Sequence, residues 1–182
     1  MNKRMLVLTG IILAAALARL LPHPPNATPI AAIALFGGAC FRGRWAAFLA
    51  PLGAMVLSDV VLGLTRYRDH SLFPLQAVVY ACFLAEAALG RLIAGRRSVW
   101  RIGAAGLAGS VLFFVATNFA VWAGGTLYPL TAAGLVECYT AAIPYFRNTL
   151  LGDAVCITIL FGGLALLENR AAWMREPAPR AA

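Results

Sequence analysis

The sequence predicts an all-α membrane protein with six transmembrane helices, and three observations support that prediction. Hydrophobic residues make up 62% of the 182 residues and charged residues only 12%, about half of the charged fraction of a soluble domain. Six apolar runs follow one another along the chain, separated by short polar segments. The basic residues gather in clusters between these runs, which is typical of topology signals in membrane proteins.

The first apolar run, residues 5–21, is just long enough to cross a hydrocarbon core of about 30 Å at about 1.5 Å per residue. It contains Ala14 and Ala18, a pair of small residues one turn apart that lets another helix approach closely. The proline-rich residues 22–26 cannot be helical. We therefore expect them at an interface or along a cavity.

The second run, residues 29–41, is short and rich in glycine, which fits either a tilted span or a broken one. The third and fourth runs, residues 45–64 and 72–93, have the length of full spans. The fourth run carries Glu86 about seven residues from its inner end. We expect this carboxylate to find a partner inside the bundle or to extend toward Arg91.

The last part of the chain holds two more runs, residues 102–123 and 149–167, with a shorter piece between them. That piece, residues 131–143, has Thr131 as a helix N-cap and ends at Pro144. It is too short to span a bilayer, so we expect a short interfacial or re-entrant helix before the last span.

The distribution of positive charge predicts the topology. With the N-terminus inside, most of the 15 lysines and arginines fall on the inner side, as the positive-inside rule requires. Both termini are then cytoplasmic (N-in/C-in). The prediction is a single transmembrane domain over residues 1–170 and a polar cytoplasmic tail over residues 171–182.

Polar residues of four spans are predicted to share one layer, within roughly 3 to 8 Å of the outer boundary. Such residues beside membrane-depth sequence indicate a functional site, and the outer loops above this layer add further polar groups. The candidate substrate-binding residues are Arg19, His23, Asn26, Asp59, Asn118, Tyr139, Arg147, Asn148 and Asp153.

Each of these residues also has a structural interpretation. Asp153 falls in the predicted first turn of a helix, where a carboxylate is favoured by the helix dipole. Arg19 and Asp59 could form an ion pair between spans, and Tyr139 fits an aromatic belt at the membrane interface. The agreement in depth across four spans favours a shared site for the set.

The sequence gives no sign of catalysis or of a cofactor. It has no nucleophile elbow, no HExxH motif and no phosphate-binding loop, so the chain is predicted not to be an enzyme and not to hydrolyse ATP alone. Its four cysteines show no metal-ligand spacing. The net charge of +8 is explained by the topology signals, so no nucleic-acid partner is expected.

Several segments resemble a bacterial integral-membrane family of unknown function, over nearly the whole chain. The resemblance lies in RLLPHPPN, PIAAIALFGG, the Ser-Asp pair, TNFAVW and CYTAAIPYFRNTLLGD, which are residues 19–26, 29–38, 58–59, 117–122 and 138–153. It implies a multi-pass protein of the bacterial cytoplasmic (inner) membrane. It implies no activity.

In size, span number and orientation the chain also resembles the S components of energy-coupling-factor vitamin transporters. That resemblance implies capture of a vitamin-like molecule from the outer side, with Ala14 and Ala18 docking a transmembrane coupling subunit and its ATPases. Some S components bind cobalamin, and there a cysteine thiol meets the cobalt. Cys82 or Cys138 would be the metal ligand only if the ligand is cobalamin.

Two other functions remain open at this point. The chain could be a non-catalytic structural subunit of a membrane complex, with the outer polar residues forming an internal network. It could also be a membrane enzyme acting on a lipid or cell-wall substrate, with Asp59 or Glu137 as the base.

Overall fold

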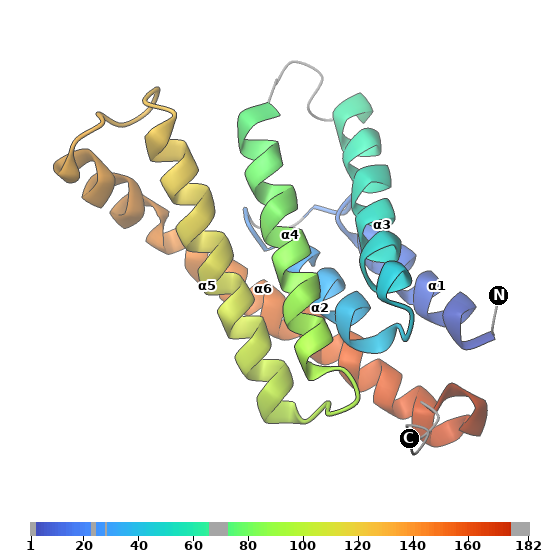
Figure 1. The fold of residues 1–182 in the computed structure, drawn as a ribbon. Helices are drawn as coiled ribbons and strands as arrows, with labels where there is room; N and C mark the ends of the chain where they lie inside the picture. The colour runs from blue at the N-terminus through green and yellow to red at the C-terminus, as the bar shows by residue number, and fades with distance from the viewer. Residues whose placement is uncertain (1–2, 23–24, 28, 66–72, 176–182) are drawn as a thin grey trace.

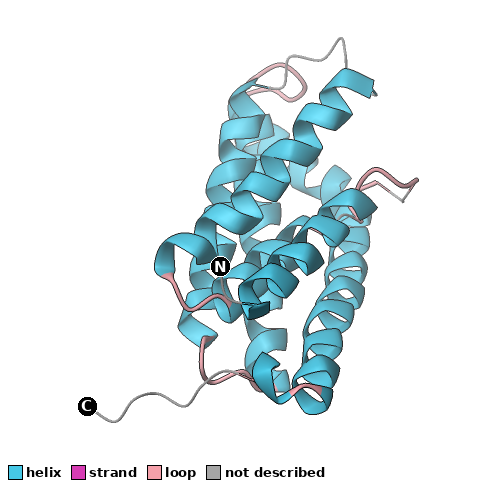
Figure 2. Cartoon of the chain, turned by 90° about the vertical axis from the view of Figure 1, so that its right-hand side faces the viewer, coloured by secondary structure: helices cyan, strands magenta, loops and turns pink. Residues whose placement is uncertain are grey.

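The computed structural model describes residues 3–22, 25–27, 29–65 and 73–175, and these residues form helices joined by turns and loops, with no strand among them (Figures 1 and 2). The all-α prediction is therefore confirmed for the described residues. In chain order the helices are α1 (Lys3–Ala18), α2 (Ile30–Cys40), α3 (Arg44–Thr65), α4 (Phe73–Ile93), α5 (Val99–Ala123), α6 (Ala132–Arg170) and the short 3₁₀ helix η1 (Ala172–Met174).

Successive α-helices run in opposite directions (Figure 1). The end of one helix therefore lies at the same end of the bundle as the start of the next. Arg4, at the start of α1, donates to the backbone oxygen of Cys40 at the end of α2 at 2.9 Å. Arg91, near the end of α4, donates to the backbone oxygen of Phe41 at 2.8 Å. These contacts place the start of α1 and the ends of α2 and α4 at the same level.

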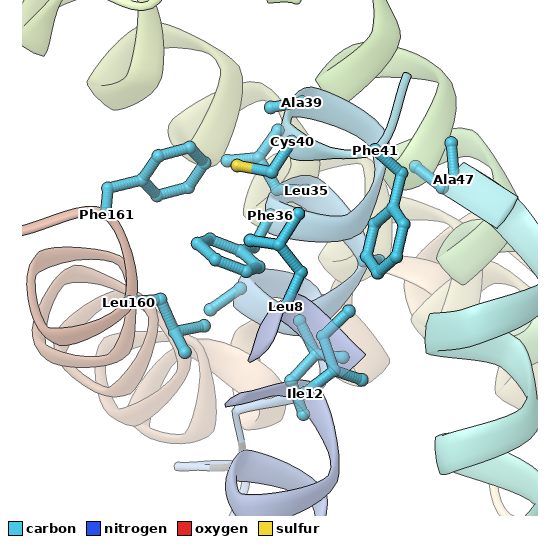
Figure 3. Packing of buried hydrophobic residues seen from close by; sticks show 14 of the residues in the cluster. Leu8, Ile12, Leu35, Phe36, Ala39, Cys40, Phe41, Ala47, Leu160 and Phe161 are labelled. Carbon is cyan, nitrogen blue, oxygen red and sulfur yellow. The ribbon is translucent and has the colours of Figure 1, made fainter. Parts of the chain in front are cut away.

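Helix α2 forms the centre of the bundle. All of its residues from Ala32 to Cys40 are buried, because α2 contacts each of the other five α-helices. Figure 3 shows Phe36 with Phe161 of α6 on one side and Leu8 of α1 on another. The rings of Phe36 and Phe161 meet edge to face, with centroids 5.3 Å apart. A helix that is apolar on all sides must be buried in this way.

The tightest helix crossing joins α2 and α4 through Gly38 and Gly90. A Cβ atom added at Gly38 would collide with the backbone oxygen of Ala87, and one added at Gly90 would collide with that of Leu35. Small residues at a crossing allow two helix backbones to touch. The glycine-rich composition of the second run is therefore explained by close helix packing.

Four helices, α3 to α6, are long and apolar enough to cross a membrane. This result indicates a membrane protein. Helix α1 has 16 residues and α2 only 11, and 11 residues rise about 16 Å, roughly half of the hydrocarbon thickness. Six complete spans, with both termini inside, stay a prediction.

The prediction of a separate short helix over residues 131–143 is wrong. Helix α6 continues through Pro144 and has 39 residues in all, so it is about 58 Å long. Proline removes only one backbone donor, and α5 supports both sides of it. Phe114 of α5 contacts Tyr139 before the proline and Phe146 after it, with ring centroids 5.5 and 4.5 Å apart. The expected N-cap is confirmed, since the Thr131 hydroxyl accepts a hydrogen bond from the Gly134 amide at 3.1 Å.

We predict that Gly38→Ala lowers the stability of the protein by about 1–3 kcal/mol, because the added methyl group meets the backbone of α4 and no side chain can turn away from it. Gly53→Ala in α3 is the matched control, because nothing lies within 4 Å of a Cβ atom at that position. Thermal unfolding of the purified protein in detergent measures both. An unchanged melting temperature for Gly38→Ala would show that the two helices do not touch there.

Candidate functional site

Arg19 and Asp59, two of the predicted site residues, form a buried ion pair near the end of α1. Arg19 Nη2 lies 2.8 Å from Asp59 Oδ1, and the Arg19 and Asp59 side chains are only 9% and 20% exposed. A second nitrogen of Arg19 donates a short hydrogen bond to Ser58 Oγ. The structural alternative for this pair therefore has direct support in the structure.

The other oxygen of Asp59 is also occupied. Asp59 Oδ2 accepts hydrogen bonds from Gln76 Nε2 at 2.8 Å and from Tyr80 Oη at 2.9 Å, both on α4. The carboxylate thus has three partners from two neighbouring helices, which leaves it little capacity to bind a substrate. The outer network, as this group is called here, consists of Arg19, Ser58, Asp59, Gln76 and Tyr80.

Three further candidates bond to backbone oxygens. Asn118 donates to Phe114 of its own helix at 2.7 Å, Tyr139 donates to Val115 at 2.7 Å, and Asn148 donates to Pro25 at 3.1 Å. The first is a local bond within α5. The second ties α6 to α5, and the third ties α6 to the proline-rich segment.

The remaining outer candidates lie in loops or on the surface. Asn26 is exposed and adopts a positive φ of 62°, a conformation that asparagine tolerates better than most residues. Arg147 is exposed, and no hydrogen bond or ion pair joins it to the described residues. His23 lies outside the described residues.

Asp153 lies inside a helix, contrary to the first-turn position expected from the sequence. It is buried (3% exposed), and it accepts a hydrogen bond at 2.7 Å from the hydroxyl of Ser110, in the middle of α5. The sequence placed the start of this helix at residue 149, whereas α6 begins at Ala132. Asp153 therefore lies well inside the helix and is not a capping residue.

Asp153 lines a partly open cavity of about 670 Å³ between α5 and α6, here named the α5–α6 groove. Its walls come from one face of each helix, because the lining residues recur at intervals of three and four. The residues are Arg97, Val99, Ile102, Gly103, Gly106, Leu107, Ser110, Leu150, Asp153, Ala154, Ile157, Thr158, Phe161, Gly162, Ala165 and Glu168.

The groove is apolar along most of its length and polar at two places. Ser110 and Asp153 are joined at one of them. At the other, Arg97 Nη2 lies 3.1 Å from Glu168 Oε1. Arg4 approaches the same oxygen at 3.6 Å, which completes an inner cluster of Arg4, Arg97 and Glu168. This cluster ties the start of α1 to the end of α6.

Glu86 is the group that sequence reasoning placed outside the site. It is only 2% exposed, and neither carboxylate oxygen has a hydrogen-bond partner among the described residues. The expected contact with Arg91 is not formed, because that guanidinium donates to the backbone of Phe41. The signal available in the sequence was a lone carboxylate well inside an apolar run.

The cysteine and alanine candidates occupy different surroundings. Cys82 and Cys138 are both buried, and the Cys138 thiol donates to the backbone oxygen of Asn118 at 3.4 Å. In the part of the chain that the structure describes, no three histidine, cysteine or acidic residues gather in a way that could hold a metal ion. Ala14 and Ala18 are exposed on α1, where a partner helix could reach them.

We predict that Asp59→Asn and Arg19→Met each lower the free energy of unfolding by about 1–3 kcal/mol, because each leaves a buried charged partner unsatisfied. Because the two residues are in direct contact, the double variant should lose less than the sum of the single losses. A double-mutant cycle by thermal unfolding measures this coupling. Additive losses would contradict a structural role for the pair.

The comparisons with known proteins identify a family but no relative of known function. A family model described as "Family of unknown function (DUF6580)" matches residues 1–178. No curated protein and no solved structure matches the chain. Because the family model covers nearly the whole sequence, the protein belongs to the DUF6580 family of unknown function.

Proposed function

We propose that this protein binds a small amphipathic molecule in the α5–α6 groove and takes part in its uptake across the membrane. The observation that carries the proposal is the groove itself, whose volume of about 670 Å³ falls within the range of about 300–1,000 Å³ for small-molecule sites. It combines apolar walls with a few polar groups at fixed places. Such a combination holds an apolar body and orients a polar group.

Small side chains create the space. Nothing lies within 4 Å of a Cβ atom placed at Gly103 or at Gly162, whereas one at Gly106 would lie 2.5 Å from Ile157 Cδ1. The helices are thus close together near Gly106, and the two other glycines leave room on the open side. A ligand of moderate size would fill that room and cover Ser110 and Asp153.

The proposal keeps the expected orientation and partners. One end of the bundle carries several arginines, among them Arg4, Arg91 and Arg97. By the positive-inside rule, this end corresponds to the cytoplasmic side. The ligand, a vitamin-like compound or another small amphipathic molecule, is captured from the opposite side. Energy for uptake comes from a separate coupling subunit with ATPases, which docks on the exposed Ala14 and Ala18 face, as the resemblance to S components implies. The membrane is the bacterial cytoplasmic membrane.

A second candidate function is that of a structural subunit. One observation favours it: the groove is partly open and its walls contain Gly103, Gly162 and Ala165, small residues that suit a close-packed helix of another protein. The enzyme alternative has less support, because Asp59 already has three partners and Glu137 is exposed on α6.

Filling the groove tests the proposal. Gly103→Leu should abolish binding of any compound that stabilises the wild-type protein, because Gly103 lines the groove and its added Cβ atom meets nothing within 4 Å. Leucine is also a better helix former than glycine, so the fold should be retained. The measurement is thermal stabilisation in lipid nanodiscs across a panel of small amphipathic compounds, cobalamin included.

The matched control is Gly53→Leu, the same change at an open position on α3, which should bind like the wild type. If a compound binds Gly103→Leu normally but no longer binds Asp59→Asn, its binding site is the outer network and not the groove. If no compound binds, and a co-purifying membrane protein is lost only from Gly103→Leu, the structural-subunit function is supported instead.

A further inference from the structure

Glu86 and Asp153 are two buried carboxyl groups on opposite sides of α5, and Asp153 also lines the α5–α6 groove. Glu86 packs over Gly109 of α5, where an added Cβ atom would lie 3.0 Å from its Cγ and 3.4 Å from its Oε1. The next residue, Ser110, donates to Asp153 Oδ2. The two acidic side chains therefore pack against consecutive residues of α5. They are named here the acidic pair.

Neither member of the acidic pair has a positive partner in the described part of the chain. Among the described residues, the ion pairs involve Asp59 and Glu168, and neither oxygen of Glu86 has a hydrogen bond. The ordinary structural use of a buried carboxylate, an internal salt bridge, is therefore not what Glu86 does. This is unlike Asp59, whose oxygens are fully engaged.

A carboxylate held in apolar surroundings needs a counter-charge, which is either a proton or a bound cation. Two titratable groups lie near the pair. The Cys82 thiol is one turn before Glu86 on α4, and the Cys156 thiol is one turn after Asp153 on α6. Neither thiol supplies a positive charge. In the empty protein a proton is thus the available counter-charge.

We infer that the acidic pair is a binding site for an organic ammonium group. The ligand of the α5–α6 groove is then an amphipathic cation, whose binding releases a proton. The inference rests on the proposed function. The ammonium group stays intact and forms a hydrogen bond with the Asp153 carboxylate in the groove, and Glu86 adds a second negative charge behind it. A proton leaves a carboxyl group for the solution, while the apolar part of the ligand lies along Leu107, Ile157 and Phe161.

An organic cation fits the surroundings better than a metal ion does. Metal ions in proteins take four or more ligands, and the described residues supply no set of three acidic, cysteine or histidine groups at one place. An ammonium group needs only a few acceptors, and its apolar chain would fill the space at Gly103 and Gly162.

The test compares three probes of the same chain length: octylammonium, neutral octanol and anionic octanoate. Binding to the full-length protein in phosphatidylcholine nanodiscs is measured by calorimetry, with empty nanodiscs subtracted. We expect octylammonium to bind roughly ten-fold or more tightly than octanol, because charge-assisted hydrogen bonds to a buried carboxylate are the stronger kind. Octanoate should bind most weakly.

The substitutions Glu86→Gln and Asp153→Asn should each remove most of that preference, so that octylammonium and octanol bind the same variant with similar affinity. Glu137→Gln on the exposed face of α6 is the matched control and should behave like the wild type. Octylammonium binding should tighten between about pH 6 and about pH 8, where the amine stays charged, because protons then compete less for the carboxyl groups. Glu86→Gln should weaken this dependence.

The outcomes separate the two proposals. If octanol and octylammonium bind equally and Gly103→Leu abolishes both, the groove is a ligand site but the acidic pair does not select a cation, and the inference is overturned. If no probe binds the wild type and none binds Gly53→Leu, both the inference and the proposed function are overturned. A preference for octylammonium that survives both acidic-pair substitutions also overturns the inference.

Discussion

The backbone crossing of α2 and α4 at Gly38 and Gly90 is the constraint on which the rest of the structure depends. It lets an 11-residue helix sit at the centre of the bundle, too short to span a bilayer by itself and buried along its length from Ala32. The other helices pack around this centre. The crossing also fixes α4, so that Glu86, one turn before Gly90, comes to lie against Gly109 of α5.

The buried polar groups of this protein fall into two kinds. In the outer network and the inner cluster, charges have partners from other helices, and these contacts hold α1 against α3 and α6. The acidic pair has one hydrogen bond from Ser110 and no ion pair among the described residues. Since burying a charge without a partner is costly, the pair is the place where a ligand would gain most by binding. The outer network and the inner cluster connect helices by ion pairs, and the acidic pair is the part proposed to bind a ligand.

The fold class could be predicted from the sequence, because hydropathy and basic clusters are strong signals in lipid. The site could not, for reasons that particular residues make plain. Pro144 was interpreted as a helix end, although Phe114 of α5 supports the helix on both sides of it, and this error placed Asp153 in the first turn of a helix. Arg19 and Asp59 were grouped by depth as site residues, with an ion pair between them as the alternative, and the structure contains that ion pair. Glu86 was expected to find a partner in the bundle or to extend toward Arg91, but Arg91 donates to the backbone oxygen of Phe41.

The central claim is that a ligand binds between α5 and α6 beside the acidic pair and not within the outer network. Photoaffinity labelling with a diazirine-bearing octylammonium, followed by peptide mapping, tests it most directly. The account predicts cross-links on the groove faces of α5 and α6, near Leu107 and Ile157, and their loss with excess octylammonium. Competable cross-links on the residues around Arg19, Asp59 and Arg147, with none in the groove, would contradict it.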